Sequence, residues 1–127
     1  VSEQKMRSGT IIVAEDDTYI RGLICRLLEK SGYRVLESEN PEDALRFASG
    51  ESDFMLLTDI VMPHMNGYEL ASKLGEHNHD LRVLLMSGYQ DRSFIVPEKA
   101  LPAKNLFLEK PFSHEALLEA LDKLAAL

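Results

Sequence analysis

Residues 11–17 read Ile11-Ile12-Val13-Ala14-Glu15-Asp16-Asp17, so that four apolar residues are followed at once by three acids. A short, continuous and mostly β-branched apolar run is typical of a strand buried on both faces. The apolar residues that come next recur at intervals of three and four, as on one face of a helix. They are Ile20, Leu23, Ile24, Leu27 and Leu28, and Ser31-Gly32 ends the pattern. The sequence therefore begins with a strand, an acidic turn and an amphipathic helix.

The same alternation of short apolar runs and helical patterns continues along the chain. We predict further strands at residues 35–36, 54–57, 83–86 and 106–108. A second helix should begin at Pro41, after Asn40 as its N-cap, and end at Gly50. Further helices should span residues 68–74, closed by Gly75, and follow Ser113 as a cap. Between the fourth and fifth strands Pro97 and Pro102 interrupt the pattern, and we expect one short or distorted helix there.

Strands that alternate with helices imply a parallel sheet covered by helices on both faces. Because crossover connections are right-handed, few topologies remain. We predict an α/β, flavodoxin-like, doubly wound sheet of five parallel strands in the order 2-1-3-4-5. Residues 1–9 are mostly polar, so we expect a flexible lead-in followed by a single domain over residues 10–127.

Length and composition exclude several classes of protein. A chain of 127 residues corresponds to one domain. Its net charge of −7 argues against direct binding to nucleic acid or to anionic membranes, which both favour a basic face. No apolar run approaches the roughly 18 residues of a membrane-inserted helix. The single cysteine, Cys25, cannot form an internal disulfide, which fits a reducing compartment and predicts a cytoplasmic location.

Polar side chains stand at the carboxyl ends of the predicted strands, which meet at one edge of such a sheet. These side chains are Glu15, Asp16, Asp59, Ser87 and Lys110. Neighbouring carboxylates repel unless they are protonated or hold a cation, and hard oxygen ligands suit Mg²⁺. A carboxylate can act as a nucleophile that forms an aspartyl phosphate, and a lysine can pair with a phosphoryl oxygen. The sequence therefore predicts Mg²⁺-assisted phosphoryl transfer at this edge.

Four motifs, each at a strand end, together resemble the receiver domains of response regulators in two-component signalling. They are Ala14-Glu15-Asp16-Asp17, Asp59-Ile60-Val61-Met62-Pro63-His64-Met65-Asn66-Gly67, Met86-Ser87-Gly88 and Glu109-Lys110-Pro111-Phe112. The resemblance covers the chain from about Thr10 to Ala126. It implies a phosphoacceptor that takes a phosphoryl group from the phosphohistidine of a histidine kinase or histidine phosphotransfer protein and changes conformation. The run around Phe107 to Phe112 also looks similar to the receivers of hybrid histidine kinases.

The resemblance implies a role for each residue that matches the motifs. Asp59 would accept the phosphoryl group. Mg²⁺ would be bound by Asp16 and Asp59, by Glu15 through a water molecule, and by the main-chain carbonyl of Val61. Glu15 stands where aspartate is more common in the family. Lys110 would pair with the phosphoryl group.

The conformational switch would involve Ser87 and Phe107. Ser87 would move toward the phosphoryl group, and Phe107 would turn inward behind it. Because Phe107 has no hydroxyl, it is expected to lean inward more readily than a tyrosine would. Ordinary packing remains the alternative interpretation of Phe107. The resemblance also implies a cis peptide bond between Lys110 and Pro111, a geometry that proline permits.

Three other functions are weighed against this one. A haloacid-dehalogenase type of phosphatase would need a second acid two positions after Asp59, where Val61 stands. A flavodoxin-like cofactor binder would need a loop rich in Gly, Ser and Thr in place of Glu15-Asp16-Asp17. A phosphorylation-independent docking module with the receiver fold remains the alternative. We expect no enzymatic activity beyond self-phosphorylation and autodephosphorylation, although a parent chain could be a hybrid histidine kinase. The sequence does not identify the output domain or protein that the receiver would act on.

Overall fold

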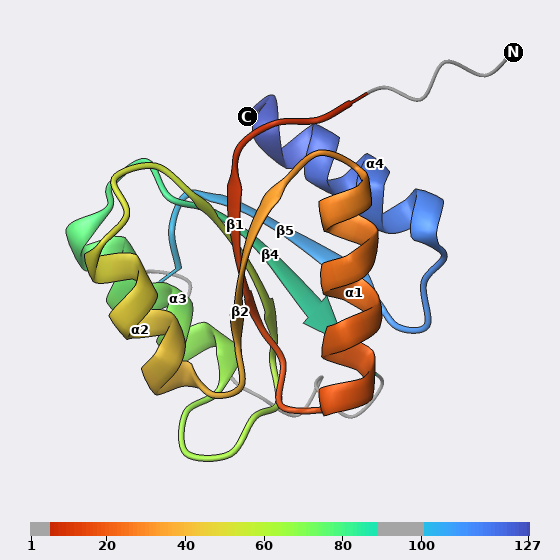
Figure 1. Ribbon diagram of the computed structural model, residues 1–127. Coiled ribbons are helices and arrows are strands. Elements are labelled where there is room, and N and C mark those ends of the chain that lie inside the picture. Colours follow the sequence, from red (N-terminus) through yellow and green to blue (C-terminus); the bar gives the residue numbers. More distant parts are fainter. Residues whose placement is uncertain (1–5, 89–100) are drawn as a thin grey trace, which may run out of the picture.

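The computed structural model describes residues 6–88 and 101–127, which form a five-stranded parallel sheet between two pairs of helices (Figure 1). The elements are β1 (Thr10–Ala14), α1 (Thr18–Lys30), β2 (Arg34–Ser38), α2 (Pro41–Ser49), β3 (Met55–Asp59), α3 (Gly67–His77), β4 (Arg82–Ser87), β5 (Lys104–Glu109) and α4 (His114–Ala125). The strand order is β2-β1-β3-β4-β5. The predicted flavodoxin-like, doubly wound topology is therefore confirmed.

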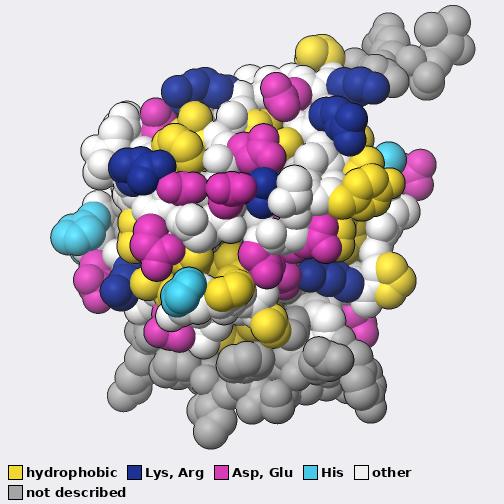
Figure 2. Space-filling view, turned by 60° about the horizontal axis from the view of Figure 1, so that its bottom comes forward, with side chains coloured by type: hydrophobic (Ala, Val, Ile, Leu, Met, Phe, Trp, Pro, Cys, Tyr) yellow, Lys and Arg dark blue, Asp and Glu magenta, His cyan; other side chains and the backbone are white. Residues whose placement is uncertain are grey.

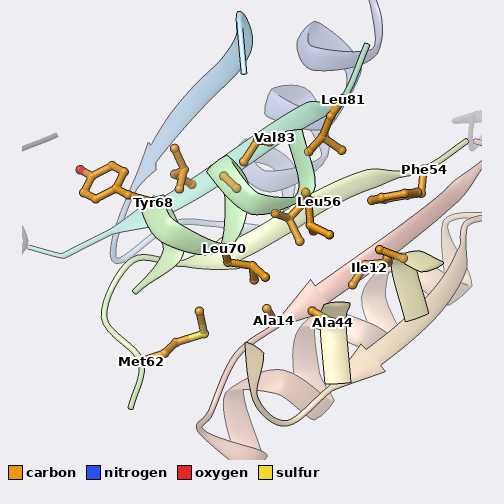
Figure 3. Packing of buried hydrophobic residues seen from close by; sticks show 14 of the residues in the cluster. Ile12, Ala14, Ala44, Phe54, Leu56, Met62, Tyr68, Leu70, Leu81 and Val83 are labelled. Atoms are coloured by element: carbon orange, nitrogen blue, oxygen red, sulfur yellow. The ribbon is translucent and has the colours of Figure 1, made fainter. Parts of the chain in front are cut away.

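The two faces of the sheet carry two separate apolar cores. Side chains of a strand point alternately to opposite faces, and β1 divides its residues accordingly. Ile12 and Ala14 pack with α2 and α3, whereas Ile11 and Val13 pack with α1 and α4. Figure 1 shows these two pairs of helices on opposite sides of the sheet. Figure 3 shows the first core, in which Ile12, Leu56 and Val83 of three neighbouring strands meet side chains of α2 and α3. Because both faces are covered, the sheet leaves only its ends for polar chemistry.

Side-chain caps fix where the described helices begin, and thus where the loops at the sheet edge end. Asp17 accepts hydrogen bonds from the backbone N–H groups of Tyr19 and Ile20, both at 3.0 Å. Asn66 and Glu69 form a reciprocal capping box at the start of α3. Asn40 and Ser113 cap α2 and α4, as their places in the sequence predict. Each cap satisfies backbone donors that the first turn leaves free.

Every predicted strand is shorter than the observed one, and the predicted end of the third helix is wrong. The third strand begins at Met55 and continues to Asp59, because Asp59 pairs with Met86 of β4. The helix expected to close at Gly75 instead continues to His77. A Cβ atom at position 75 would lie 3.1 Å from Cγ of Pro102, so this glycine makes room for a neighbouring segment and does not end the helix. The helix expected between the fourth and fifth strands falls on residues 89–100, outside the described residues.

The inner face of α1 also differs from the predicted stripe. Ile20 and Leu23 are 39% and 44% exposed, while Arg21 and Cys25 are buried beside the expected Ile24 and Leu28. The helix is thus turned so that its buried face includes a cation. The apolar side chains of Ile20 and Leu23 are left at the surface near the carboxyl ends of the strands.

The polar lead-in is attached to the domain at Arg7. Its guanidinium makes two hydrogen bonds, at 2.8 and 2.9 Å, to the carboxylate of Asp122 on α4. Its backbone N–H donates to the carbonyl of Ser31 at 2.8 Å. Gly32 has a φ of 108°, and a Cβ atom there would lie 2.0 Å from the carbonyl oxygen of Arg7. Only glycine therefore allows the lead-in to cross the end of α1 at this distance.

Candidate functional site

Three carboxylates meet where β1 and β3 end. Ligand atoms of Glu15, Asp16 and Asp59 all lie within 4.8 Å of one another. Glu15 and Asp59 are 2% and 6% exposed, whereas Asp16 is open to solvent. Figure 2, which turns the lower end of Figure 1 toward the viewer, shows acidic side chains with lysine and arginine side chains beside them. The sheet topology thus brings together the acids that the sequence predicts to be neighbours.

The buried Glu15 is the least satisfied of the three acids. Its Oε1 accepts a hydrogen bond from the backbone N–H of Asp17 at 3.2 Å. Its Oε2 is buried and has no hydrogen-bond partner among the described residues. Burial, and next the negative charge of Asp59, raise the pKa of Glu15 to about 8, against a smaller opposing effect of Lys110. A buried acceptor without a partner beside a second acid is a place where a cation lowers the free energy.

The ammonium group of Lys110, the residue after β5, faces the same cluster. Its Nζ lies 2.9 Å from Oδ1 of Asp59, and its side chain is 30% exposed. The backbone N–H of Lys110 donates to the carbonyl of Ser87 at 2.8 Å. This hydrogen bond holds Lys110 beside the end of β4. The Lys110–Pro111 peptide bond is cis, as the resemblance implies. The structure therefore brings Ser87, Asp59 and Lys110 to one edge of the sheet.

Two further predicted residues lie at the surface of this edge. Val61 follows Asp59 on the loop to α3 and is 44% exposed. Phe107 on β5 is 49% exposed, and its ring centroid lies 6.2 Å from that of Tyr68 on α3. The ring is thus half in solvent rather than packed in either core.

Gly67, to which the sequence assigned no role beyond its place in the motif that begins at Asp59, contacts the site directly. A Cβ atom at this position would lie 2.3 Å from the carbonyl oxygen of Asp59. The backbone N–H of Gly67 donates to the carbonyl of Ile60 at 2.7 Å. The first residue of α3 therefore packs directly on the backbone of Asp59. The signal in the sequence was Asn66-Gly67 itself, a cap followed by the one residue that tolerates so close an approach.

The donor set fits a magnesium ion. Hard carboxylate oxygens are the protein ligands that Mg²⁺ prefers, and it usually keeps several water molecules. The exposed Asp16 leaves one side of the cluster open to water, while the unpartnered Oε2 of Glu15 offers a buried acceptor. Beside the cluster, a groove of about 550 Å³ opens between α1 and α4, lined by Ile20, Leu23, Lys110 and further mainly apolar residues. The cluster thus combines a cation-binding donor set with access from solvent.

Among the described residues, no helix is long and apolar enough to cross a membrane.

Comparisons with known proteins agree with this geometry. The family described as "Response regulator receiver domain" matches residues 11–122. The response regulator receiver protein CpdR of Brucella abortus is 35% identical over 114 residues, which cover 90% of this chain and 94% of CpdR. The sensor kinase CckA of the same organism is 35% identical over 115 residues, but these are 87% of this chain and 12% of CckA.

The likeness extends to solved structures. The receiver domain protein of Clostridium thermocellum superposes with a TM-score of 0.83 at 22% identity, covering 93% of this chain and 94% of that one. At this identity the match supports the fold. Taken with the site geometry and the match over residues 11–122, these findings show that the chain belongs to the response regulator receiver domains, the phosphoacceptor modules of two-component signalling.

Proposed function

We propose that Asp59 is the residue of this receiver that accepts the phosphoryl group. The observation that carries this proposal is the position of its carboxylate, which lies between two other acids and a lysine. Its ligand atoms are within 4.8 Å of those of Glu15 and Asp16, and Lys110 Nζ is 2.9 Å from Oδ1. No other group of acids in the described residues has a comparable arrangement. A carboxylate so placed can attack phosphorus while neighbouring charges stabilise the oxygens that gain charge.

In this proposal a side-chain oxygen of Asp59 forms a bond to phosphorus as the bond from phosphorus to a histidine nitrogen of the donor breaks. The released imidazole keeps the electron pair and takes up a proton. Asp16, Asp59, the main-chain carbonyl of Val61 and, through water, Glu15 would hold Mg²⁺. The ion supplies charge neutralisation for the phosphoryl oxygens. Lys110 leaves its present contact with Asp59 to pair with a phosphoryl oxygen.

The switch would follow from the same contacts. Ser87, at the end of β4, would donate its hydroxyl hydrogen to a phosphoryl oxygen, and the ring of Phe107 on the neighbouring strand would then turn inward. In the pairing of β4 with β5, Leu85 lies opposite Phe107 and Ser87 lies opposite Glu109. Ser87 and Phe107 therefore lie on neighbouring strands, two positions apart in register. Phosphorylation would bias a two-state equilibrium that already exists in the unmodified protein.

The proposed role implies a phosphoryl donor, a cellular location and a kind of parent protein. The donor would be a histidine kinase or a histidine phosphotransfer protein, and the receiver would work in the cytoplasm without catalysing turnover of an outside substrate. The chain spans nearly all of CpdR but about an eighth of CckA, so both a single-domain relay and a receiver within a hybrid kinase are consistent with it. A phosphorylation-independent docking role would leave the buried acids and Lys110 without a purpose.

Intact mass spectrometry after incubation with acetyl phosphate tests the proposal. The wild-type protein should gain the mass of one phosphoryl group with Mg²⁺ and none when the ion is chelated. Asp59→Asn is the matched control, because it keeps the side chain nearly isosteric while removing the nucleophilic carboxylate. Equal gain in the control, or gain independent of Mg²⁺, would contradict the proposal. A folded protein that binds Mg²⁺ and gains nothing would favour the docking module.

A further inference from the structure

Arg21 is a buried cation that the phosphoacceptor chemistry does not use directly. It lies in the first turn of α1 and is 4% exposed, and no other lysine or arginine of the described residues is buried. Burying a charge is costly unless partners replace its water. The contacts of its guanidinium should therefore show why the position holds an arginine.

Those contacts join three segments at the edge of the sheet. Nη1 of Arg21 donates to the carbonyl oxygen of Glu15 at 2.9 Å, in a buried hydrogen bond. Nε donates to Oε1 of Glu37 on β2 at 2.9 Å. Nη2 lies 3.6 Å from Oε1 of Glu39, just past the end of β2. The guanidinium is thus held from outside by two carboxylates and presents a donor inward to the backbone.

The backbone carbonyl that Arg21 contacts lies between two of the clustered acids. The carbonyl of Glu15 belongs to the peptide unit that joins Glu15 to Asp16, two of the three clustered acids. The far side of the same loop is fixed by Asp17, whose backbone N–H donates to Glu15 and whose side chain caps α1. Without Arg21 this peptide unit would lose its side-chain donor and could rotate, moving both carboxylates relative to Asp59.

We infer that Arg21 is a positioning residue: its hydrogen bond to the Glu15 carbonyl, oriented by Glu37, sets the geometry in which Glu15 and Asp16 bind a divalent cation. This role rests on the proposed function of the cluster. Partners that orient metal ligands commonly contribute 10-fold to 100-fold in metal affinity. Arg21 acts on a backbone carbonyl rather than on a ligand side chain, so its loss should displace two ligands together.

Isothermal titration calorimetry with Mg²⁺, on the unphosphorylated protein, tests the inference. Arg21→Met, which keeps an apolar stem of similar length, should weaken Mg²⁺ binding by about tenfold or more. Arg21→Lys can donate to the Glu15 carbonyl or to Glu37 but not to both in the same fork, so its affinity should fall in between. Arg26→Met is the matched control: Arg26 lies on the same helix and donates to the Gly22 carbonyl at 3.2 Å, but it is exposed. Its Mg²⁺ affinity should equal that of the wild type.

Thermal unfolding with and without saturating Mg²⁺ separates positioning from stability. If Arg21 positions the ligands, the rise in melting temperature that Mg²⁺ produces should shrink in Arg21→Met and recover in part in Arg21→Lys. Equal Mg²⁺ affinity and an equal Mg²⁺-induced rise in Arg21→Met and the wild type would overturn the inference. If Arg21→Met does not fold, Glu37→Gln carries the test, since it loosens the guanidinium without removing it. It should weaken Mg²⁺ binding, and unchanged affinity in both Glu37→Gln and Arg21→Lys would overturn the role.

The results that would contradict the proposed function differ from those that would contradict the role of Arg21. A wild-type protein that neither binds Mg²⁺ nor accepts a phosphoryl group would contradict the function of the whole cluster. A wild-type protein that does both, with Arg21 variants that bind Mg²⁺ equally well, would contradict only the role of Arg21.

Discussion

Nζ of Lys110 lies 2.9 Å from Oδ1 of Asp59, so the end of β5 supplies a positive charge to the buried acid at the end of β3. This ion pair partly neutralises the cluster before any cation or phosphoryl group arrives. The lysine therefore has two opposite effects, since it competes with Mg²⁺ for Asp59 and stabilises a phosphoryl group on the same residue.

Replacing Lys110 by methionine should separate these two effects. Mg²⁺ should bind more tightly because the competing charge is gone. The gain should be only about 1 kcal/mol, or roughly fivefold, because solvent screens the partly exposed Lys110 side chain. Phosphorylation by acetyl phosphate should be about 100-fold slower, because one stabilising charge is lost from the transition state. Calorimetry and the rate of mass gain measure the two quantities. Lys123→Met, in the last turn of α4, should change neither; an unchanged rate in Lys110→Met would refute the assigned role.

Gly67→Ala should displace the backbone of Asp59. The added Cβ would stand 2.3 Å from the Asp59 carbonyl oxygen, a contact that only a backbone shift can relieve. We expect the free energy of unfolding to fall by about 1–3 kcal/mol, as for other overpacked sites. Phosphorylation should slow as well.

Gly22→Ala is the natural comparison for that variant in urea unfolding. Gly22 lies in α1, where the nearest atom to an added Cβ is the flexible Arg26 Nη2 at 3.9 Å. Alanine should stabilise the helix by about 0.5–1 kcal/mol. Similar unfolding free energies for the two variants would show that the contact with Asp59 does not constrain position 67.

The ring of Phe107 should become buried when Asp59 carries a phosphoryl mimic. It is now 49% exposed. Moving an apolar ring from water into an apolar site lowers the free energy. Crystal structures of the protein with and without beryllofluoride would show the exposed fraction of the ring. Equal outward occupancy in both states would contradict its role as a switch and leave packing against Tyr68 as its function.

Cys25 should be chemically inert in the folded protein. Burial, and next the charges of Glu37 and Glu29, raise the pKa of its thiol to about 12. At pH 8 the thiol therefore stays protonated, and the reactive thiolate should be about 1000-fold scarcer than in the unfolded chain. Alkylation by iodoacetamide should be correspondingly slow in buffer and rapid in urea. Comparable rates in the two solvents would show that α1 does not bury this residue.

The sequence predicted the sheet because its strands are short, apolar and separated by helical periods. That pattern depends on local spacing, and it also placed the acids and Lys110 at one edge. What it missed depends on contacts between segments distant along the chain. Gly75 resembles a helix stop, but it is small because Pro102 approaches it. Arg21 stands next to an apolar stripe, and only its contacts with Glu37 on β2 and with Glu39 just past that strand reveal why it is buried.

The most direct test of the central claim is to locate the phosphoryl group. Sodium borohydride reduces an aspartyl phosphate to homoserine, so reduction after treatment with acetyl phosphate and Mg²⁺, followed by peptide mass spectrometry, marks the acceptor. We expect homoserine at position 59 and unmodified aspartate at positions 16 and 17. Homoserine at Asp16 or Asp17, or a phosphate on Ser87 that resists borohydride, would contradict it.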